Sequence, residues 1–181
     1  PGVLKQVRAR DTRTVDITKS GPGWSTVLTG VWRDRHGVDS NRFGANHLDR
    51  HPSFIAQLER AHPELVTSFV NSWGPLARFA AAADHQVDCD HEDRWDECSI
   101  EQALRQVSET DVDLLFLYLR SIDETGHRFG FHPTVPEYVE RIGWIDEQIG
   151  ALIDRLRSRC TFAREKWLVL AVTDFGIDPG D

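Results

Sequence analysis

Two nearly unbroken apolar runs stand out from the mixed pattern of apolar and polar positions along the chain. VDLLFLYL occupies residues 112–119 and WLVLAVTDF occupies residues 167–175. Such runs are typical of strands that are covered on both faces of a parallel sheet. LVTSFVNSW, residues 65–73, predicts a third strand, and TRTVDIT, residues 12–18, predicts a fourth with a weaker pattern.

Helical patterns separate these runs. Three short ones cover residues 53–61, 75–83 and 100–108, and we expect Ser99 to cap the last of them. The longest pattern extends from about residue 136 to residue 159 and repeats apolar residues at helical spacing along one side. Helices that connect buried strands predict an α/β fold, in which helices flank a mainly parallel sheet. A chain of 181 residues is long enough for one such domain.

Three polar stretches fall at positions where parallel sheets gather functional groups. In TKSGPGWSTVLTG, Ser20 precedes a Gly-Pro-Gly turn and a short apolar helix, while IDETGH and TDFG follow the ends of the two apolar runs. Sites in α/β folds gather at the carboxyl ends of strands. The hydroxyl of Ser20 can act there as a nucleophile, or Ser20 can simply belong to a turn.

Composition and charge narrow the class of protein. A hydrophobic share of 40% with 28% charged residues is typical of a soluble globular protein, and the net charge of −8 argues against binding to nucleic-acid polymers. No apolar run reaches the length of a membrane span. The first ten residues, PGVLKQVRAR, lack the apolar stretch of a signal peptide, so the sequence either has none or has already lost it. The acidic block at residues 84–98 predicts a solvated loop.

The chain contains three cysteines, and three interpretations of them stay open. Cys89 and Cys98 flank the acidic loop closely enough to form a disulfide, which favours a secreted or periplasmic protein. The alternatives are free thiols, or a metal site shared with His85 and His91, although the spacing fits no zinc pattern well. Cys160 lies at the end of a helical pattern and is interpreted as a packed or idle thiol.

Acidic and imidazole side chains supply candidate metal ligands. Asp123 and His127 lie four residues apart just past a predicted strand, with Gly126 between them. They can bind one divalent ion, or form a polar loop pair without a metal. Asp174 closes another predicted strand and is either a metal or catalytic group or a cap for a following helix.

Taken together, these stretches resemble the alkaline phosphatase superfamily and, more narrowly, its nucleotide pyrophosphatase/phosphodiesterase-like branch. The similarity extends over residues 15–176 and is most specific from residue 20 to residue 38. The family pattern has a nucleophilic Ser or Thr, a helix that ends in Thr-Gly, an aromatic residue and a His-Gly pair. The corresponding residues are Ser20, Thr29, Gly30, Trp32, His36 and Gly37.

The resemblance implies a metal-dependent phosphoric ester hydrolase that acts on a small-molecule phosphate ester through a covalent phospho-enzyme. It implies two divalent ions, with zinc as the first choice. Carried over by position, Ser20 is the nucleophile and a ligand of the second ion, Asp123 and His127 bind the first ion, and Asp174 binds the second. Thr18 is the alternative nucleophile if the alignment is shifted. Helix N–H groups after Ser20 are expected to stabilise the phosphoryl oxygens.

Departures from the family pattern predict an incomplete alkaline-phosphatase-like domain over residues 1–181. Phe175 stands where the family has a metal-binding His, and Gly23 stands where many relatives have a polar side chain that contacts phosphate. The family's first metal-ligand segment, upstream of the nucleophile, and its C-terminal His are not found in the sequence. Other histidines could supply ligands: His47, His51, His85, His91 and His132.

Two further interpretations follow from these departures. The chain could be a catalytically impaired family member that binds a ligand or partner. Alternatively, Trp95 and Trp144, if exposed beside the acidic loop, indicate a protein-interaction module, whereas burial of Trp144 would assign it to the core. A truncated sheet edge is compatible with a homodimer.

Overall fold

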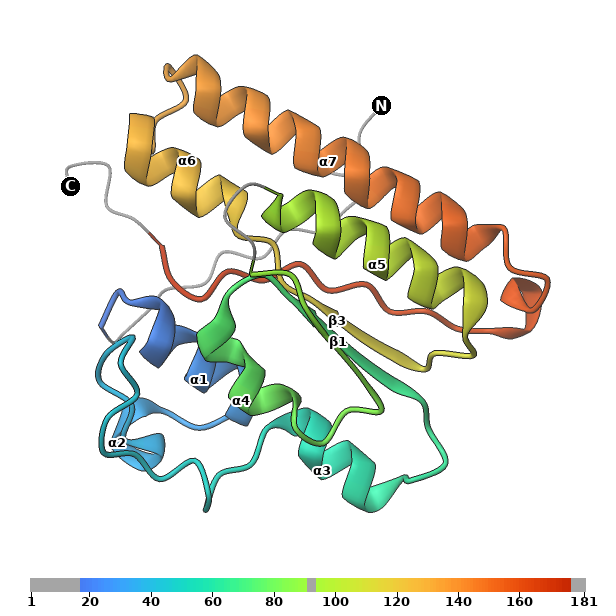
Figure 1. Ribbon diagram of the computed structural model, residues 1–181, viewed down its shortest axis with the longest axis horizontal. Coiled ribbons are helices and arrows are strands. Elements are labelled where there is room, and N and C mark those ends of the chain that lie inside the picture. Colours follow the sequence, from blue (N-terminus) through green and yellow to red (C-terminus); the bar gives the residue numbers. More distant parts are fainter. Residues whose placement is uncertain (1–16, 91–93, 177–181) are drawn as a thin grey trace.

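The computed structural model describes residues 17–90 and 94–176 and shows an α/β fold (Figure 1). The elements follow one another as α1 (Ser20–Thr29), α2 (Arg33–His36), α3 (Phe54–Ala61), β1 (Thr67–Asn71), η2 (Gly74–Leu76), α4 (Ala77–Ala80), β2 (His85–Asp88), α5 (Trp95–Glu109), β3 (Leu114–Leu117), α6 (Ser121–Phe129), α7 (Pro136–Arg157) and η3 (Phe162–Arg164). The predicted fold class is confirmed.

The described strands form one parallel sheet in the order β2-β1-β3. The apolar runs at 65–73 and 112–119 therefore form neighbouring strands, as predicted. Phe69 of β1 lies opposite Phe116 of β3, and their rings stack with centroids 4.4 Å apart. β2 was not predicted, because its four residues alternate between half-buried and exposed positions within the acidic block.

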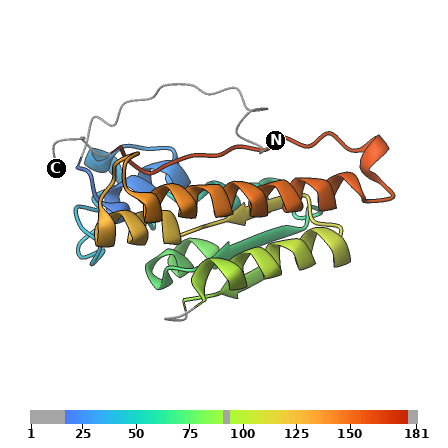
Figure 2. The same cartoon turned by 90° about the horizontal axis from the view of Figure 1, so that it is seen from above.

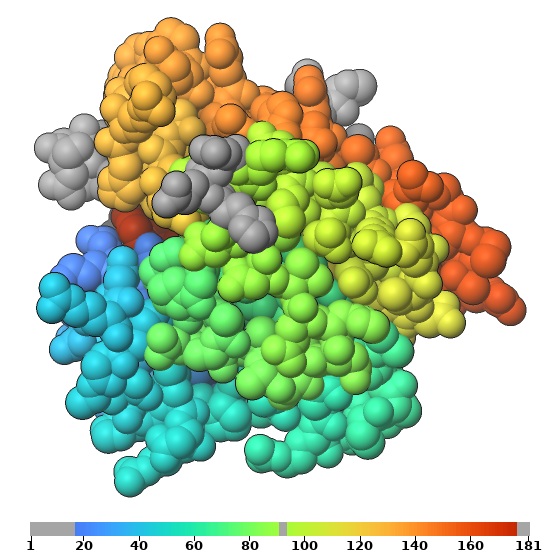
Figure 3. Space-filling model, viewed as in Figure 1, coloured from blue at the N-terminus to red at the C-terminus, as the bar shows by residue number. Residues whose placement is uncertain are grey.

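Helices cover both faces of this sheet (Figures 1 and 2). On one face, α1, α3 and α4 contribute Trp24, Leu28, Ile55 and Phe79 to a buried cluster that includes Phe69 of β1. On the other face, α5 and α7 contact each other, and their side chains lie side by side on the surface (Figure 3). A smaller buried cluster lies beneath them and contains Val107, Val112 and Leu156.

Strand β3 connects the two clusters through the alternation of its side chains. Phe116 packs in the α1 cluster and Leu115 packs in the α5–α7 cluster. Trp24 of α1 meets Phe116 and Tyr118 edge to face, with ring centroids 6.0 Å and 5.2 Å away. These contacts fix the start of α1 against the carboxyl end of β3.

The motif residue His36 has a structural role at the junction of α1 and α2. Its buried ring accepts a hydrogen bond from the Val38 N–H at Nδ1, so the neutral ring carries its proton on Nε2. Nε2 lies 3.1 Å from the hydroxyl of Thr26 in α1. The His-Gly pair therefore ties the segment after α2 back to the helix that begins at Ser20.

The prediction of a buried strand at residues 167–175 is wrong. This segment runs as an extended coil beside the helices and strands (Figure 2), and no ladder pairing joins it to the described sheet. Leu168 and Leu170 are 77% and 74% exposed. An apolar run becomes a buried strand only if a neighbouring strand and a covering layer are supplied, and the described residues supply neither on this side.

Other boundaries differ from the prediction. α5 begins at Trp95, so Ser99 lies inside the helix, where it is buried, and does not cap it. The stretch IDETGH is helical, within α6, and not a turn. The predicted helix at 75–83 is shorter and forms η2 and α4. Most of the predicted strand at 12–18 lies outside the described residues. Within the described ranges, no helix is long and apolar enough to span a bilayer.

Candidate functional site

The start of α1, the start of α6 and Asp174 meet at the carboxyl end of β3. α1 begins at Ser20, and a Cβ built on Gly23 in its first turn would lie 2.6 Å from the backbone oxygen of Asp174 and 2.9 Å from its Cβ. α6 follows β3 after three residues and carries Asp123 and His127. Three stretches that are far apart in sequence thus lie together, as expected for the carboxyl edge of a parallel sheet.

The carboxyl group of Asp174 has one oxygen without a hydrogen-bond partner in the described structure. This oxygen, Oδ2, is buried. Burial raises the pKa of the Asp174 carboxyl to about 7, and the charge of Asp123 raises it further against opposing hydrogen bonds from the backbone. Burying a carboxylate without a positively charged partner costs free energy, unless a cation binds to it.

Asp123, which is half-buried, and His127, which is exposed, form a pair on one side of α6. Asp123 Oδ1 lies 3.6 Å from His127 Nε2, at the i, i+4 spacing that aligns side chains on a helix. Burial raises the pKa of Asp123, while the proximity of His127 opposes that rise. The His127 ring also packs edge to face on Phe131, with centroids 5.1 Å apart. The helix therefore presents one carboxylate and one imidazole together.

Tyr118 is a residue of this site that the sequence analysis did not identify. It is buried just beyond the end of β3, and burial raises its pKa well above the usual range. The charges of Asp174 and Asp123 add to that rise, which places the phenol within their electrostatic reach. Its position as the single phenol in an apolar run was the available signal.

The expectation that helix N–H groups after Ser20 are free for phosphoryl oxygens is wrong. The Gly21 N–H donates to Asn41 Oδ1 at 2.7 Å, and Gly23 donates to the Lys19 oxygen at 3.0 Å. Pro22, between them, has no N–H. Ser20 itself is half-buried at the first position of α1, whereas Thr18 is exposed outside the helix.

The donor chemistry of these residues fits a divalent cation. Two carboxylates and one imidazole are the ligand types that zinc and related ions take from proteins. Asp174 Oδ2 has no hydrogen-bond partner in the described structure, and the pKa values of the Asp174 and Asp123 carboxyls are both raised. Carboxylate ligands of a cation show both features when the cation is not present.

The structure gathers fewer ligands than a complete catalytic zinc site has. No group of three or more His, Cys, Asp or Glu side chains has metal-binding geometry within residues 17–90 and 94–176. Phe175 offers no ligand atom. His132 bonds to Thr134, and His91 lies outside the described residues.

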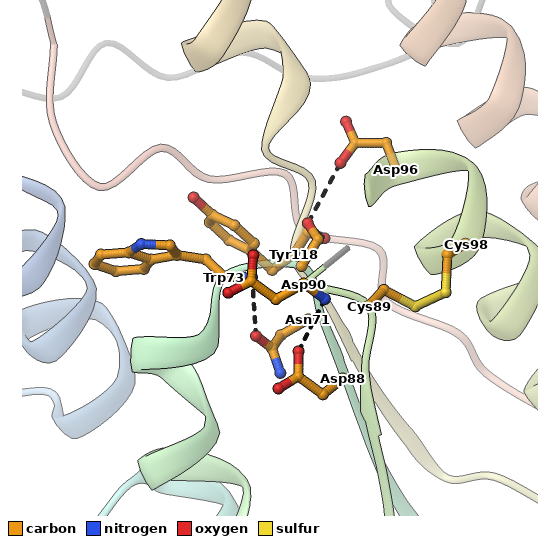
Figure 4. The surroundings of a disulfide bond; sticks show 9 residues. Asn71, Trp73, Asp88, Cys89, Asp90, Asp96, Cys98 and Tyr118 are labelled. Atoms are coloured by element: carbon orange, nitrogen blue, oxygen red, sulfur yellow. Dashed lines mark hydrogen bonds between the residues drawn. A yellow bond between two sulfur atoms is a disulfide. The ribbon is translucent and has the colours of Figure 1, made fainter. Parts of the chain in front are cut away.

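The acidic block contains a disulfide and a buried carboxylate (Figure 4). Cys89 and Cys98 are joined, as one of the three interpretations predicted, and Cys160 is free and exposed. The expectation of a wholly solvated loop is wrong, because Asp96 is fully buried. A charge-rich stretch gives no periodic signal that could have distinguished this one acid from its neighbours.

The two tryptophans expected to mark an interaction surface are both half-buried. The Arg120 guanidinium lies 4.4 Å above the Trp95 ring, and the Arg141 guanidinium lies 4.9 Å above the Trp144 ring. Trp95 of α5 is therefore covered by the arginine at the N-cap of α6, and Trp144 is covered by an arginine of its own helix, α7. This removes the observation on which the interaction-module interpretation depended.

Comparison with known families now gives the class of protein. A family model described as type I phosphodiesterase / nucleotide pyrophosphatase matches residues 75–181, which is more than half of the chain. The chain belongs to this family, and its α/β architecture is consistent with an incomplete alkaline-phosphatase-like core. No solved structure matches the chain. The matched range includes Asp123, His127 and Asp174, whereas Ser20 precedes it.

Proposed function

We propose that the chain hydrolyses small phosphate esters, with phosphodiesters as the substrate class, in a reaction that requires a divalent metal. The observation that supports this most directly is the meeting of Asp174, Asp123 and the start of α1 at one edge of the sheet. Family membership supports hydrolysis of phosphodiesters as the reaction class.

In this proposal Asp123 and His127 hold one cation, and Asp174 and the hydroxyl of Ser20 hold a second, with zinc the first choice for both. A cation bound there would lower the pKa of the Ser20 hydroxyl and neutralise charge on the phosphoryl oxygens. The Ser20 oxygen would form a bond to phosphorus as the bond to the leaving ester oxygen breaks, and the Ser20 proton would leave with the alcohol that is released. Water would then cleave the bond between Ser20 and phosphorus, which restores the hydroxyl and releases the phosphomonoester. Ser20 begins the turn of α1 that contains Gly23, the residue against which Asp174 packs, and this supports the role.

Tyr118 is assigned a supporting role. Because its pKa lies above the usual range, the phenol stays protonated throughout the physiological range and can donate a hydrogen bond. Its ring also packs on Trp24 of α1, which fixes the first turn relative to β3. The phenol thus orients groups in the site without carrying charge.

The test is hydrolysis of bis(p-nitrophenyl) phosphate by the full chain, with added Zn²⁺ and with chelator. We expect turnover that chelator removes and that Ser20→Ala lowers by at least about 10⁴-fold. Thr18→Ala, an exposed hydroxyl two residues away, is the matched control and should retain the rate. Chelator-resistant turnover, or an unchanged rate in Ser20→Ala, would contradict the proposal.

The small ligand set favours one second candidate, binding of a phosphate ester without turnover. Phe175 adds no ligand atom beside Asp174, and fewer ligands weaken charge compensation in the transition state. This candidate predicts that Zn²⁺ and inorganic phosphate bind while the chromogenic diester stays intact.

A further inference from the structure

Asp96 connects three elements through one buried carboxylate. It lies in the first turn of α5 and is completely buried. Its Oδ1 accepts hydrogen bonds from the Arg120 N–H at 2.7 Å and from the Ser72 hydroxyl at 3.4 Å. Its Oδ2 accepts from the Ser121 N–H at 2.9 Å and from the Ser121 hydroxyl. Four donors therefore converge on the two oxygens of one side chain.

These bonds supply α6 with a cap that its own sequence lacks. The N-cap position of α6 is Arg120, whose side chain makes no capping hydrogen bond. The first N–H groups of a helix have no intrahelical acceptor and carry partial positive charge. A carboxylate from another helix satisfies two of them here, and Ser72 at the end of β1 attaches the same carboxylate to the sheet.

The helix that Asp96 caps carries the candidate metal ligands. Asp123 lies two residues after Ser121, and His127 follows one turn later on the same helix. The direction in which both side chains point is set by the orientation of the first turn of α6. Asp96 fixes that turn from outside the ligand set.

The Cys89–Cys98 disulfide restrains the helix turn that carries Asp96. Cys98, two residues after Asp96 on α5, is bonded to Cys89, which is buried immediately after β2 (Figure 4). The Cys89 N–H donates to the Asn71 oxygen at the end of β1 at 2.7 Å. The first turn of α5 is thereby joined covalently to the carboxyl edge of the sheet.

Arg120 does not neutralise Asp96 by direct pairing with its side chain. The guanidinium binds Asp90 at 3.0 Å and Glu124 at 2.6 Å. The carboxylate is instead stabilised by four hydrogen-bond donors, an arrangement that an amide of the same shape cannot reproduce, because one of its two terminal atoms is itself a donor.

We propose that Asp96 is a positioning residue for Asp123 and His127, and that the Cys89–Cys98 disulfide holds Asp96 in place. The inference rests on the proposed function only in treating Asp123 and His127 as metal ligands. Residues that orient metal ligands from outside the coordination sphere affect metal affinity strongly, although they do not touch the ion.

The test compares Asp96→Asn with Glu101→Gln, an exposed acid on the same helix that serves as the matched control. Hydrogen–deuterium exchange of the full chain without metal should show α6 amides exchanging about 10-fold faster in Asp96→Asn and unchanged in the control. Competition with a chromophoric chelator should show Zn²⁺ affinity lowered about 10–100-fold in Asp96→Asn. Asp123→Asn establishes that the Zn²⁺ measured is bound at this site.

If Asp96→Asn does not fold, Ser121→Ala gives a milder test, because it removes one donor and leaves the backbone bonds. It should show the same two changes with smaller amplitude. Unchanged α6 exchange and unchanged Zn²⁺ affinity in the folded variants would overturn the inference. If the wild-type protein binds no Zn²⁺, the proposed function fails, and the exchange of α6 alone decides whether Asp96 holds this helix.

Discussion

The charge of Asp174 should make the stability of the metal-free protein depend on pH in an unusual direction. Its carboxyl is buried, its Oδ2 has no hydrogen-bond partner in the described structure, and its pKa is raised from 3.8 to about 7. The perturbation that tests this is Asp174→Asn, which keeps the shape of the side chain and removes the titration.

The sign of this pH dependence follows from which state, folded or unfolded, binds the proton of Asp174 more tightly. Because the folded-state pKa lies above the unfolded-state value, the folded protein binds the proton better, and protonation stabilises it. This contribution is fully present below the unfolded-state value of 3.8 and is lost as pH rises through about 7. As the pH falls from about 8 to about 5, protonation of Asp174 raises the free energy of unfolding by the equivalent of roughly two pK units, or about 3 kcal/mol.

The assay is urea unfolding in the presence of chelator at several pH values. Wild-type protein should gain stability relative to Asp174→Asn as the pH falls over this range. Asp154→Asn, an aspartate that is 77% exposed, is the matched control and should follow the wild type. Excess Zn²⁺ should abolish the gain, because a bound cation favours the ionised carboxylate. Parallel pH profiles of wild type and Asp174→Asn would refute the reasoning.

Three other predictions concern the packing around two glycines and the exposed apolar segment. Gly23→Ala should destabilise the protein by about 1–3 kcal/mol in thermal unfolding, since the new Cβ would meet the backbone oxygen of Asp174 at 2.6 Å. Gly143→Ala, on a helix with open space at the Cβ position, should instead stabilise it by about 0.5–1 kcal/mol. Leu170→Lys should reduce the concentration-dependent self-association that we expect from the exposed apolar segment, measured by analytical ultracentrifugation. A wild-type protein that stays monomeric at all concentrations would show that expectation to be wrong.

Elements with a strong apolar pattern could be predicted from the sequence. β1, β3, α3 and α7 lie where the patterns placed them, because each buries apolar side chains at the period of its own backbone. β2 and the first turn of α5 could not be predicted in this way. Both lie in the acidic block, where the residue that matters most, Asp96, is buried by its hydrogen bonds and not by hydrophobicity.

Part of the location of the site was predictable, because β3 ends at the carboxyl edge of the parallel sheet and α6, which carries Asp123, begins there. This rule does not account for Asp174, which lies beside Gly23 of α1 in an extended coil and not at the end of a strand of the described sheet. The position of the strand ends also does not predict which backbone N–H groups already have a hydrogen-bond acceptor. Asn41 takes the Gly21 N–H through a contact 20 residues away, which no local pattern reveals.

The glycine at position 23 and the aspartate at position 174 have to be understood together. Many members of the branch that the sequence resembles have a polar side chain that contacts phosphate at the position of Gly23. Here even a methyl group at that position would overlap with the backbone oxygen of Asp174. The backbone and Cβ of Asp174 thus occupy the space into which such a side chain would extend. Asp123 lies within electrostatic reach of Asp174, and under the proposed function a phosphate ester would bring more negative charge to the same place. The free energy of bringing these anions together falls only when positive charge is present, so the proposed function predicts that metal binding and phosphate binding at this edge of the sheet are strongly coupled.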